Sequence, residues 1–280
     1  MLTKSQIVNW LDEDIKTGDI TSEALIQNER IAEAKFVLKE DGVLCGLDYI
    51  GQIFSTIDNN STTEVHVKDG QKNKRGTCLA TIKAEYKTIL KGERTCLNLL
   101  QHLSGIATTT SEYVELIKQT NAKIYDTRKT TPGYRALEKN AVKTGGGNNH
   151  RIGLYDQFLI KENHLKYFSD KANPFAAAIE AAKAYRQNTP IIIEVENCDE
   201  FLLALKANPD VILLDNMSNN ELDKAVKLRD TRKSKTQCEA SGGITKNTII
   251  DIATTGVDRI SIGAITHSFK NLDISLLIEN

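Results

Sequence analysis

The sequence predicts an α/β protein in which a small antiparallel sheet is followed by repeated strand–helix units. Two patterns support this fold class. Short strand-like runs separated by turns fill residues 31–83, and beyond residue 120 apolar runs alternate with amphipathic or alanine-rich helices. Such alternation indicates a parallel sheet, which is either open or closed into a barrel.

Length and composition are those of a folded globular protein. The chain has 280 residues, 40% of them hydrophobic, with 36 Lys and Arg against 37 Asp and Glu. This balance gives no general attraction to nucleic acid or membranes, so an anion site must come from local clustering. No apolar run approaches the roughly 20 residues of a membrane helix, and the N-terminus lacks an apolar signal segment. We therefore expect a cytoplasmic protein.

The cysteines predict neither disulfides nor a zinc site, because none forms a CxxC pair and they lie within apolar runs. Buried, reduced thiols are expected at all five positions, which are Cys45, Cys78, Cys96, Cys198 and Cys238.

The N-terminal part is predicted to be an antiparallel sheet with one helix over residues 47–57. Its strands are expected over residues 31–39, 62–67 and 77–84. Between Thr88 and Lys118 apolar residues recur at helical spacing. Gly105 is expected to break this stretch into helices that bridge two domains.

The C-terminal part contains the strand–helix repeats. Its strands are expected over residues 122–125, 158–160, 190–193, 210–214, 236–240 and 258–262. The clearest helix covers residues 173–186, where Asn173 opens the helix and Pro174 occupies its first turn.

The residues that follow these six strands share one pattern. Cations follow the first two strands, acids the next two and glycines the last two. In parallel β/α folds, the carboxyl ends of the strands carry the binding groups because their loops converge on one face. Turn chemistry accounts for one or two such positions but not for the ordered set, so we expect a ligand-binding face.

The cations predict a pocket for a polyanion. Little acid lies beside the cations that stand out within residues 126–164, which are Arg128, Lys129, His150, Arg151 and Lys161. Adjacent Arg128 and Lys129 are also compatible with a solvated surface pair. Residues 130–133, however, add hydroxyls, a proline and free amides suited to an anion. Arg favours bidentate carboxylates and Lys point contacts with phosphate. The glycines at 145–147 are compatible with a flexible loop or with close approach to a ligand.

Lys161 and the acids leave more than one interpretation open. A lysine at a strand end is a Schiff-base nucleophile, an anion clamp or half of an ion pair, and we favour the clamp. Glu194, Glu196 and Asp215 either neutralise the cations or face hydroxyls or a metal ion. Backbone amides suited to a phosphate follow the last two strands, at Ser241, Gly242, Gly243, Gly263 and Ala264. A phosphorylated sugar undergoing glycosyl-type transfer to an acidic partner fits this set.

The chain resembles the quinolinate phosphoribosyltransferase family over essentially its whole length. The resemblance rests on residues 18–25, 42–54, 93–108, 126–164, 210–218, 239–245 and 256–268. It implies an N-terminal α/β sandwich over residues 1–110, onto which residues 270–280 pack. It also implies an incomplete, seven-stranded α/β barrel as the catalytic domain over residues 111–270.

The resemblance implies a decarboxylating transferase of NAD biosynthesis. Phosphoribosyl pyrophosphate and quinolinate would react, with magnesium, to give nicotinate mononucleotide, pyrophosphate and carbon dioxide. Two alternatives remain open at this point. One is a related enzyme acting on another acid or base, and the other is a catalytically silent metabolite-binding protein.

The resemblance also implies a role for each matching residue. The two quinolinate carboxylates would be bound by Arg128, His150, Arg151 and Lys161, joined by Arg94 from the partner in a homodimer that can assemble into hexamers. The catalytic set would be Lys129, which reaches the pyrophosphate, with Lys161, Glu194 and Asp215. Glu194 and Asp215 would face the ribose hydroxyls and magnesium. The 5-phosphate would be held by Ser241, Gly242, Gly243 and Gly263. One departure is Ile192, where many relatives carry a glutamate. If that acid tunes Lys161 or Lys129 in the relatives, the tuning here must come from Glu196 or be absent.

Overall fold

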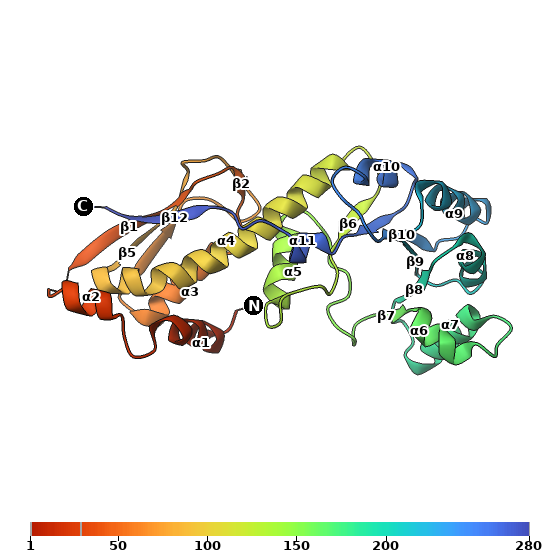
Figure 1. The fold of residues 1–280 in the computed structure, drawn as a ribbon, viewed down its shortest axis with the longest axis horizontal. Coiled ribbons are helices and arrows are strands. Elements are labelled where there is room, and N and C mark those ends of the chain that lie inside the picture. The colour runs from red at the N-terminus through yellow and green to blue at the C-terminus, as the bar shows by residue number, and fades with distance from the viewer. Residues whose placement is uncertain (1, 29, 280) are drawn as a thin grey trace. The chain divides into compact units, whose positions relative to one another are not determined.

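A computed structural model describes residues 2–28 and 30–279. The chain forms two compact units (Figure 1). Unit 1 is built from the chain up to Ser111, from Ala136–Gly146 and from the chain after His267. Unit 2 consists of Glu112–Arg135 and Gly147–His267. Each unit has its own sheet.

Unit 1 contains an antiparallel four-stranded sheet in the order β12-β1-β5-β3. Its strands are β1 (Ile31–Leu38), β3 (Thr62–Val65), β5 (Cys78–Glu85) and β12 (Ile274–Ile278). A separate two-stranded ribbon pairs β2 (Gly42–Val43) with β4 (Lys72–Asn73). The three predicted strands are confirmed. The strand β12 was not predicted; it pairs with β1 and so brings residues 274–278 to the first sheet.

The helices of unit 1 include the predicted one, α3 (Asp48–Ile57), whose Ile50, Ile53 and Phe54 are buried. The others are α1 (Lys4–Ile15), α2 (Ile20–Leu25), α4 (Tyr86–Leu116) and α5 (Arg135–Thr144). The last residues of α4 and the first residue of α5 are counted with unit 2.

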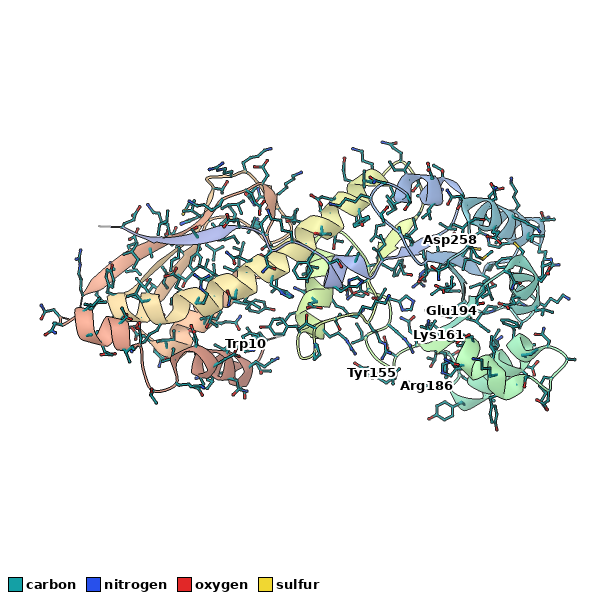
Figure 2. The ribbon with its side chains drawn as sticks, viewed as in Figure 1. Trp10, Tyr155, Lys161, Arg186, Glu194 and Asp258 are labelled. Atoms are coloured by element: carbon teal, nitrogen blue, oxygen red, sulfur yellow. The ribbon has the colours of Figure 1, made fainter. Side chains whose placement is uncertain are left out.

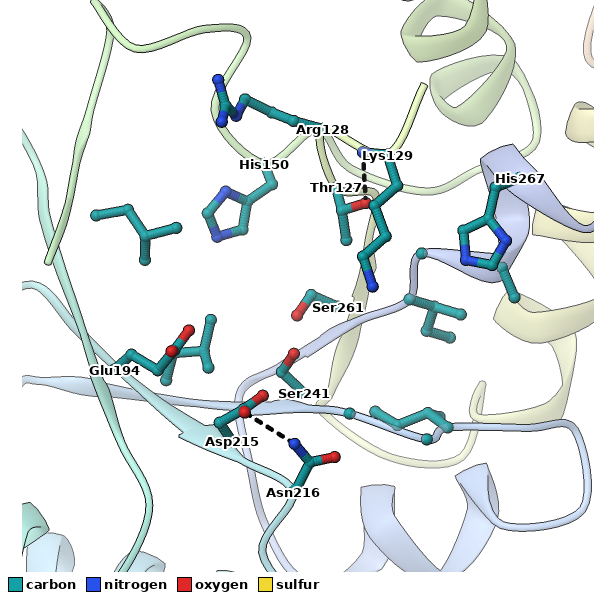
Figure 3. Close-up of a pocket in the computed structure, with 18 of the residues that line it drawn as sticks. Thr127, Arg128, Lys129, His150, Glu194, Asp215, Asn216, Ser241, Ser261 and His267 are labelled. Atoms are coloured by element: carbon teal, nitrogen blue, oxygen red, sulfur yellow. Dashed lines mark hydrogen bonds between the residues drawn. The ribbon is translucent and has the colours of Figure 1, made fainter. Parts of the chain in front are cut away.

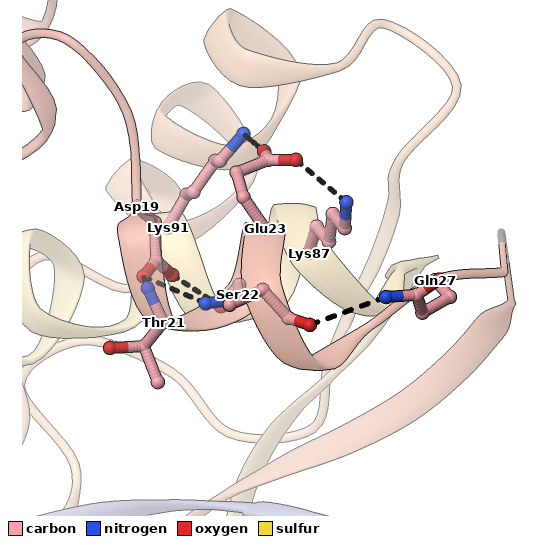
Figure 4. A network of polar contacts seen from close by, with 8 residues as sticks. Asp19, Thr21, Ser22, Glu23, Gln27, Lys87 and Lys91 are labelled. Atoms are coloured by element: carbon pink, nitrogen blue, oxygen red, sulfur yellow. Dashed lines mark hydrogen bonds and ion pairs between the residues drawn. The ribbon is translucent and has the colours of Figure 1, made fainter.

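Polar contacts fasten the short helix α2 to α4 (Figure 4). Asp19 caps α2 by accepting hydrogen bonds from the backbone N–H groups of Thr21 and Ser22, both at 3.1 Å. Glu23 forms ion pairs with Lys87 at 2.8 Å and Lys91 at 3.2 Å on α4. Hydrogen bonding to these lysines lowers the pKa of Glu23. The pairs are solvent-exposed and so orient α2 more than they stabilise it.

The predicted break at Gly105 is wrong, because α4 runs without interruption from Tyr86 to Leu116. A β-carbon on Gly105 would lie 2.4 Å from the carbonyl oxygen of Lys270, in the segment that leads into β12. Glycine is therefore required here for close approach of two backbones, not for a change in chain direction.

Unit 2 is built around a parallel six-stranded sheet in the order β6-β11-β10-β9-β8-β7. Its strands are β6 (Lys123–Tyr125), β7 (Phe158–Ile160), β8 (Ile191–Val195), β9 (Val211–Asp215), β10 (Gln237–Ser241) and β11 (Arg259–Ser261). All six predicted strands are confirmed. Asn148 adds an isolated parallel bridge to Tyr125 of β6 in place of a seventh strand. The arrangement is that of an α/β barrel.

Helices follow the strands, as expected for β/α units. They are α6 (Glu162–Leu165), α7 (Pro174–Tyr185), α8 (Cys198–Leu205), α9 (Asn219–Thr231), α10 (Ile249–Thr254) and α11 (Ala264–His267), with a 3₁₀ turn at Lys166–Phe168. The predicted start of α7 is confirmed, because the Asn173 side chain accepts from Ala176 N at 3.1 Å and Pro174 is the first helical residue. The strands are buried on both faces, which explains their continuous apolar runs.

The cysteines are free thiols, and four of the five are buried. Cys78 is the exception, since it is only partly buried. Burial raises the pKa of Cys45 to about 12, so this thiol stays protonated at neutral pH. Within the described ranges, no helix combines the length and apolar character that crossing a membrane requires.

Candidate functional site

The carboxyl ends of the six strands of unit 2 surround a cavity of about 810 Å³ (Figure 3). Every strand contributes at least one lining residue, either within its last two positions or in the loop that follows. The predicted site residues that line it are Arg128, Lys129, His150, Arg151, Lys161, Glu194, Asp215, Ser241, Gly242, Gly243 and Gly263. The sequence therefore identified one continuous site rather than scattered loop residues.

Two of the residues considered from the sequence do not line this cavity. Arg94 is exposed on α4 in unit 1. Glu196 is exposed beyond β8, where its N–H donates to Glu200 at 2.9 Å. Glu196 therefore takes no part in the polar wall formed by Glu194 and Lys161.

Several lining residues were missed by sequence reasoning. The polar ones are Ser261 and His267, and the apolar ones are Leu159, Leu213 and Ile262. The stretches that follow predicted strands contribute further lining residues, namely Thr127, Asn216, Ile244, Thr245 and Ala264. His267 lies one helical turn beyond Gly263, and that spacing was the available signal.

The cationic wall contains a buried guanidinium. Arg151 is 9% exposed, and its Nε has no hydrogen-bond partner among the described residues. Loss of water on burial lowers the pKa of Arg151, and the nearby charge of Arg128 lowers it further. Two neighbouring cations with a buried, unsatisfied donor favour the binding of an anion, which would relieve both penalties.

Arg128 and Lys129 point in different directions from the same loop, as Figure 3 shows. The backbone of Lys129 is fixed twice. Its N–H donates to Thr127 Oγ1 at 3.1 Å, and its carbonyl accepts from Thr266 Oγ1 at 2.8 Å. A β-carbon on Gly263 would lie 2.9 Å from Lys129 Cδ, so glycine leaves room for the lysine side chain. The two neighbours can therefore contact different anionic groups.

Lys161 forms an ion pair with Glu194 across the ends of β7 and β8 (Figure 2). The side chain of Lys161 is 45% exposed and that of Glu194 is 10% exposed, so the ammonium remains open to the cavity. An ion pair was one of the three roles that the sequence left open for Lys161, and this ion pair is present. His164 has a structural role, because its Nδ1 accepts from Lys161 N at 3.0 Å.

The opposite side of the cavity is formed by tight backbone turns. Gly242 and Gly243 adopt positive φ angles of 98° and 60°. A β-carbon on Gly242 would lie 2.1 Å from Asn216 Oδ1, so only glycine fits. Asn216 in turn donates to Asp215 Oδ2 at 2.8 Å. These turns place backbone groups and one carboxylate at the same edge of the cavity.

Ile192 belongs to an apolar cluster below the polar rim. It is completely buried and packs with Val211, Leu213 and Leu159, of which the last two line the cavity. The cavity therefore combines an apolar surface with charged walls, which suits a flat, acidic ring.

Glu194 and Asp215 are the carboxylates that line the cavity. In the described part of the chain, no group of three or more His, Cys, Asp or Glu side chains is placed to hold a metal ion. The donor set nevertheless fits Mg²⁺, because this ion is usually held by one or two carboxylates together with substrate phosphates.

The same fold and chain length occur in known proteins. Residues 106–277 match the family model of the quinolinate phosphoribosyl transferase C-terminal domain, and residues 19–104 match that of its N-terminal domain. A nicotinate-nucleotide pyrophosphorylase (carboxylating) of Mycobacterium leprae (strain TN) is 39% identical over 269 residues, covering 95% of this chain and 93% of its own.

Two solved structures are similar along the whole chain. The nicotinate-nucleotide pyrophosphorylase from Francisella tularensis is 39% identical, with a TM-score of 0.92, and the match covers 100% of this chain and 98% of that one. The corresponding protein from Ehrlichia chaffeensis is 38% identical, also with a TM-score of 0.92, over 100% and 99% of the two chains.

Proposed function

The chain belongs to the quinolinate phosphoribosyl transferase family, and we propose that it transfers phosphoribosyl from phosphoribosyl pyrophosphate to quinolinate with decarboxylation. The products are nicotinate mononucleotide, pyrophosphate and carbon dioxide, and the reaction serves de novo NAD biosynthesis. One observation carries the proposal. A single cavity contains Arg128, phosphate-type glycine turns and the buried Arg151, whose Nε has no hydrogen-bond partner among the described residues.

At the cationic wall, the two carboxylates of quinolinate are bound by Arg128, Arg151 and Lys161, and the imidazole of His150 completes this wall. Two guanidinium groups suit two carboxylates because each can form a paired, charge-assisted contact. Burial strengthens these contacts, since little water competes within the cavity.

At the other wall, the ribosyl donor is bound through three kinds of group. The 5-phosphate accepts hydrogen bonds from the turns of Ser241, Gly242, Gly243 and Gly263. Glu194 and Asp215 face the ribose hydroxyls, and they would hold magnesium together with the oxygens of the substrate. Magnesium supplies charge neutralisation on the pyrophosphate. Lys129 is placed to contact the same pyrophosphate.

The chemistry requires positioning more than covalent help. The bond from the ribose C1 to pyrophosphate breaks as the bond to the pyridine nitrogen forms, and positive charge develops at C1. Carboxylates beside the ribose stabilise that charge, whereas cations stabilise the departing pyrophosphate. The opposed charges of the two walls therefore follow the charge separation of the transfer.

The finer assignments belong to the same proposal. The enzyme is a cytoplasmic homodimer, and Arg94 of the partner subunit completes each cationic wall. Support comes from Arg94 being an exposed cation on α4 that does not line the cavity of unit 2.

A substrate comparison tests the function. Purified enzyme with phosphoribosyl pyrophosphate and magnesium should form nicotinate mononucleotide from quinolinate, and far more slowly from nicotinate, which lacks one carboxylate. Turnover of nicotinate without turnover of quinolinate would contradict the proposal and favour a related transferase with a different acid as substrate. Binding of quinolinate with no turnover of either acid would instead indicate a silent binding protein.

A further inference from the structure

A buried ionic layer lies one step below the cavity. Glu239 of β10 is fully buried and lies opposite Arg259 of β11 in the sheet register. The distance from Glu239 Oε2 to Arg259 Nε is 2.8 Å. Because side chains alternate along a strand, Glu239 and Arg259 share the face of Ser241 and Ser261, which line the cavity.

Arg259 is held on its other side by an aromatic ring. Its guanidinium carbon lies 3.9 Å from the centroid of the Tyr125 ring, at the end of β6. One positive and one negative charge thus balance inside the barrel, and the cation also gains a cation–π contact. The Glu239 carboxylate remains able to face a third group.

That third group is His150. The distance from its Nε2 to Glu239 Oε1 is 3.3 Å. Its other ring nitrogen, Nδ1, accepts a hydrogen bond from the Arg151 N–H at 2.8 Å. A ring nitrogen that accepts carries no proton, so this arrangement requires the tautomer with the proton on Nε2, facing Glu239.

The same contacts fix the backbone that carries Arg151. The N–H of His150 donates to Asp126 Oδ1 at 2.7 Å, and Asp126 is fully buried at the end of β6. The next N–H along the chain, that of Arg151, donates to His150 Nδ1. If the ring turned or changed its tautomer, the Arg151 N–H would lose its acceptor and the buried guanidinium would lose its support.

A purely structural ion pair explains these contacts less well. Burying a carboxylate and a guanidinium costs more than an apolar pair of similar size would. Neither carboxylate oxygen of Glu239 has a well-aligned hydrogen bond among the described residues. The pair is therefore a poor device for stability alone, whereas it supplies a fixed negative charge directly behind a residue of the cavity wall.

We propose that Glu239 is a positioning residue that, with Arg259 behind it, fixes the tautomer and orientation of His150 and thereby the placement of Arg151 in the carboxylate-binding wall. Both ring nitrogens of His150 are engaged within the protein, so His150 supports the wall and Arg151 makes the charged contact with the ligand. The carboxylate ligand in this proposal rests on the proposed function, whereas the tautomer of His150 does not.

The tautomer is measured first, on the ligand-free wild-type protein. Labelling histidine with ¹⁵N gives ring signals for only five residues, and His150→Gln identifies those of His150. The proposal expects a protonated Nε2 coupled with an unprotonated Nδ1. A proton on Nδ1, or rapid exchange between the two tautomers, overturns it. This measurement is independent of which reaction the enzyme catalyses.

Kinetics then test the consequence. Glu239→Gln should raise the KM for quinolinate about tenfold or more, the scale on which loss of a supporting residue affects a site. The kcat and the KM for phosphoribosyl pyrophosphate should change far less. Asp223→Asn is the control, because it removes the exposed ion-pair partner of Lys227 within α9 of the same unit. A quinolinate KM that changes equally in both variants overturns the proposal.

If Glu239→Gln does not fold, a second variant tests the same proposal. The double substitution Glu239→Leu with Arg259→Leu removes both charges and leaves neither one buried alone. It should fold, lose the fixed tautomer and show the same rise in quinolinate KM. A folded double variant with wild-type KM contradicts the positioning role. If the wild type does not turn over quinolinate, the proposed function fails, while the tautomer measurement still decides the role of Glu239.

Discussion

At the scale of single residues, the cavity wall is marked by two neighbouring cations, Arg128 and Arg151. Arg151 is almost completely buried beside Arg128, and burial and like charge act on its pKa in the same direction. Lys161, in contrast, has Glu194 as a partner. Arg151 should therefore contribute most where an anionic ligand is present and little to the stability of the free protein.

Truncation of Arg151 tests this difference. Arg151→Ala should weaken quinolinate binding by about 2 kcal/mol or more, which is roughly a thirtyfold rise in Kd, because a buried carboxylate would lose its charged partner. The melting temperature should fall little or rise. Arg186→Ala serves as the control, since Arg186 is an exposed arginine that donates to the Tyr155 carbonyl at 3.0 Å. Equal affinity in wild type and Arg151→Ala would remove Arg151 from the binding wall.

Acid titration tests the charge of Glu239. Burial acts to raise the pKa of this carboxyl, but contacts with His150, Arg259 and Ser261 outweigh burial, and the pKa is lowered. A lowered pKa stabilises the fold above the unfolded-state value of about 4.3, and that stabilisation is lost as the pH falls through the folded-state value.

Unfolding by urea at a series of pH values gives the readout. Glu239→Gln should be less stable than wild type at pH 7. The two free energies of unfolding should converge as the pH falls from about 4.3 through the lower folded-state pKa, where the wild-type carboxyl takes up its proton. Parallel curves down to the lowest pH would show that Glu239 is not ionised in the folded protein.

At the scale of elements, most strands and three helical stretches followed from local patterns, whereas β2, β4 and β12 did not. Short strand-like runs between turns identified β1, β3 and β5 of unit 1, and buried apolar runs identified the strands of unit 2. The helix α4 was divided wrongly at Gly105, because glycine is ambiguous in a helical pattern. Glycine is needed at this position because of the carbonyl oxygen of Lys270, which lies far away in the sequence. No local pattern carries that information.

Substitution of Gly105 distinguishes the two interpretations of this glycine. In an unconstrained helix, Gly→Ala stabilises by up to about 1 kcal/mol. Here the added methyl group meets a backbone oxygen, so Gly105→Ala should destabilise by about 1–3 kcal/mol. Gly51→Ala in α3 is the matched control, since its nearest contacts would be at 3.8 Å. A gain in stability for Gly105→Ala would mean that the close approach to Lys270 is absent.

At the scale of the whole molecule, the sequence predicted the charged half of the site better than the rest. Adjacent charges and glycines after strands can be read along the chain, whereas Ser261 and His267 enter the cavity only through the folding of the barrel. The pairing of Glu239 with His150 was also missed, because it requires β10 and the loop before β7 to meet. The proposal that two subunits share each site rests on Arg94 alone.

Subunit mixing tests that sharing. Arg94→Ala and Arg151→Ala homodimers should each be nearly inactive with quinolinate. In a mixed dimer one of the two sites has every arginine intact, so random mixing should restore about a quarter of wild-type activity. Activity that stays at the sum of the two separate variants would mean that each subunit works with its own arginines only.

Coupling of phosphoribosyl transfer to decarboxylation is tested by following both products in one reaction. Quinolinate labelled in the carboxyl group adjacent to the ring nitrogen is incubated with enzyme, magnesium and phosphoribosyl pyrophosphate, and released carbon dioxide and pyrophosphate are counted together. We predict equal amounts of both, and no carbon dioxide without phosphoribosyl pyrophosphate. Pyrophosphate released without carbon dioxide, or neither product despite quinolinate binding, would contradict the account.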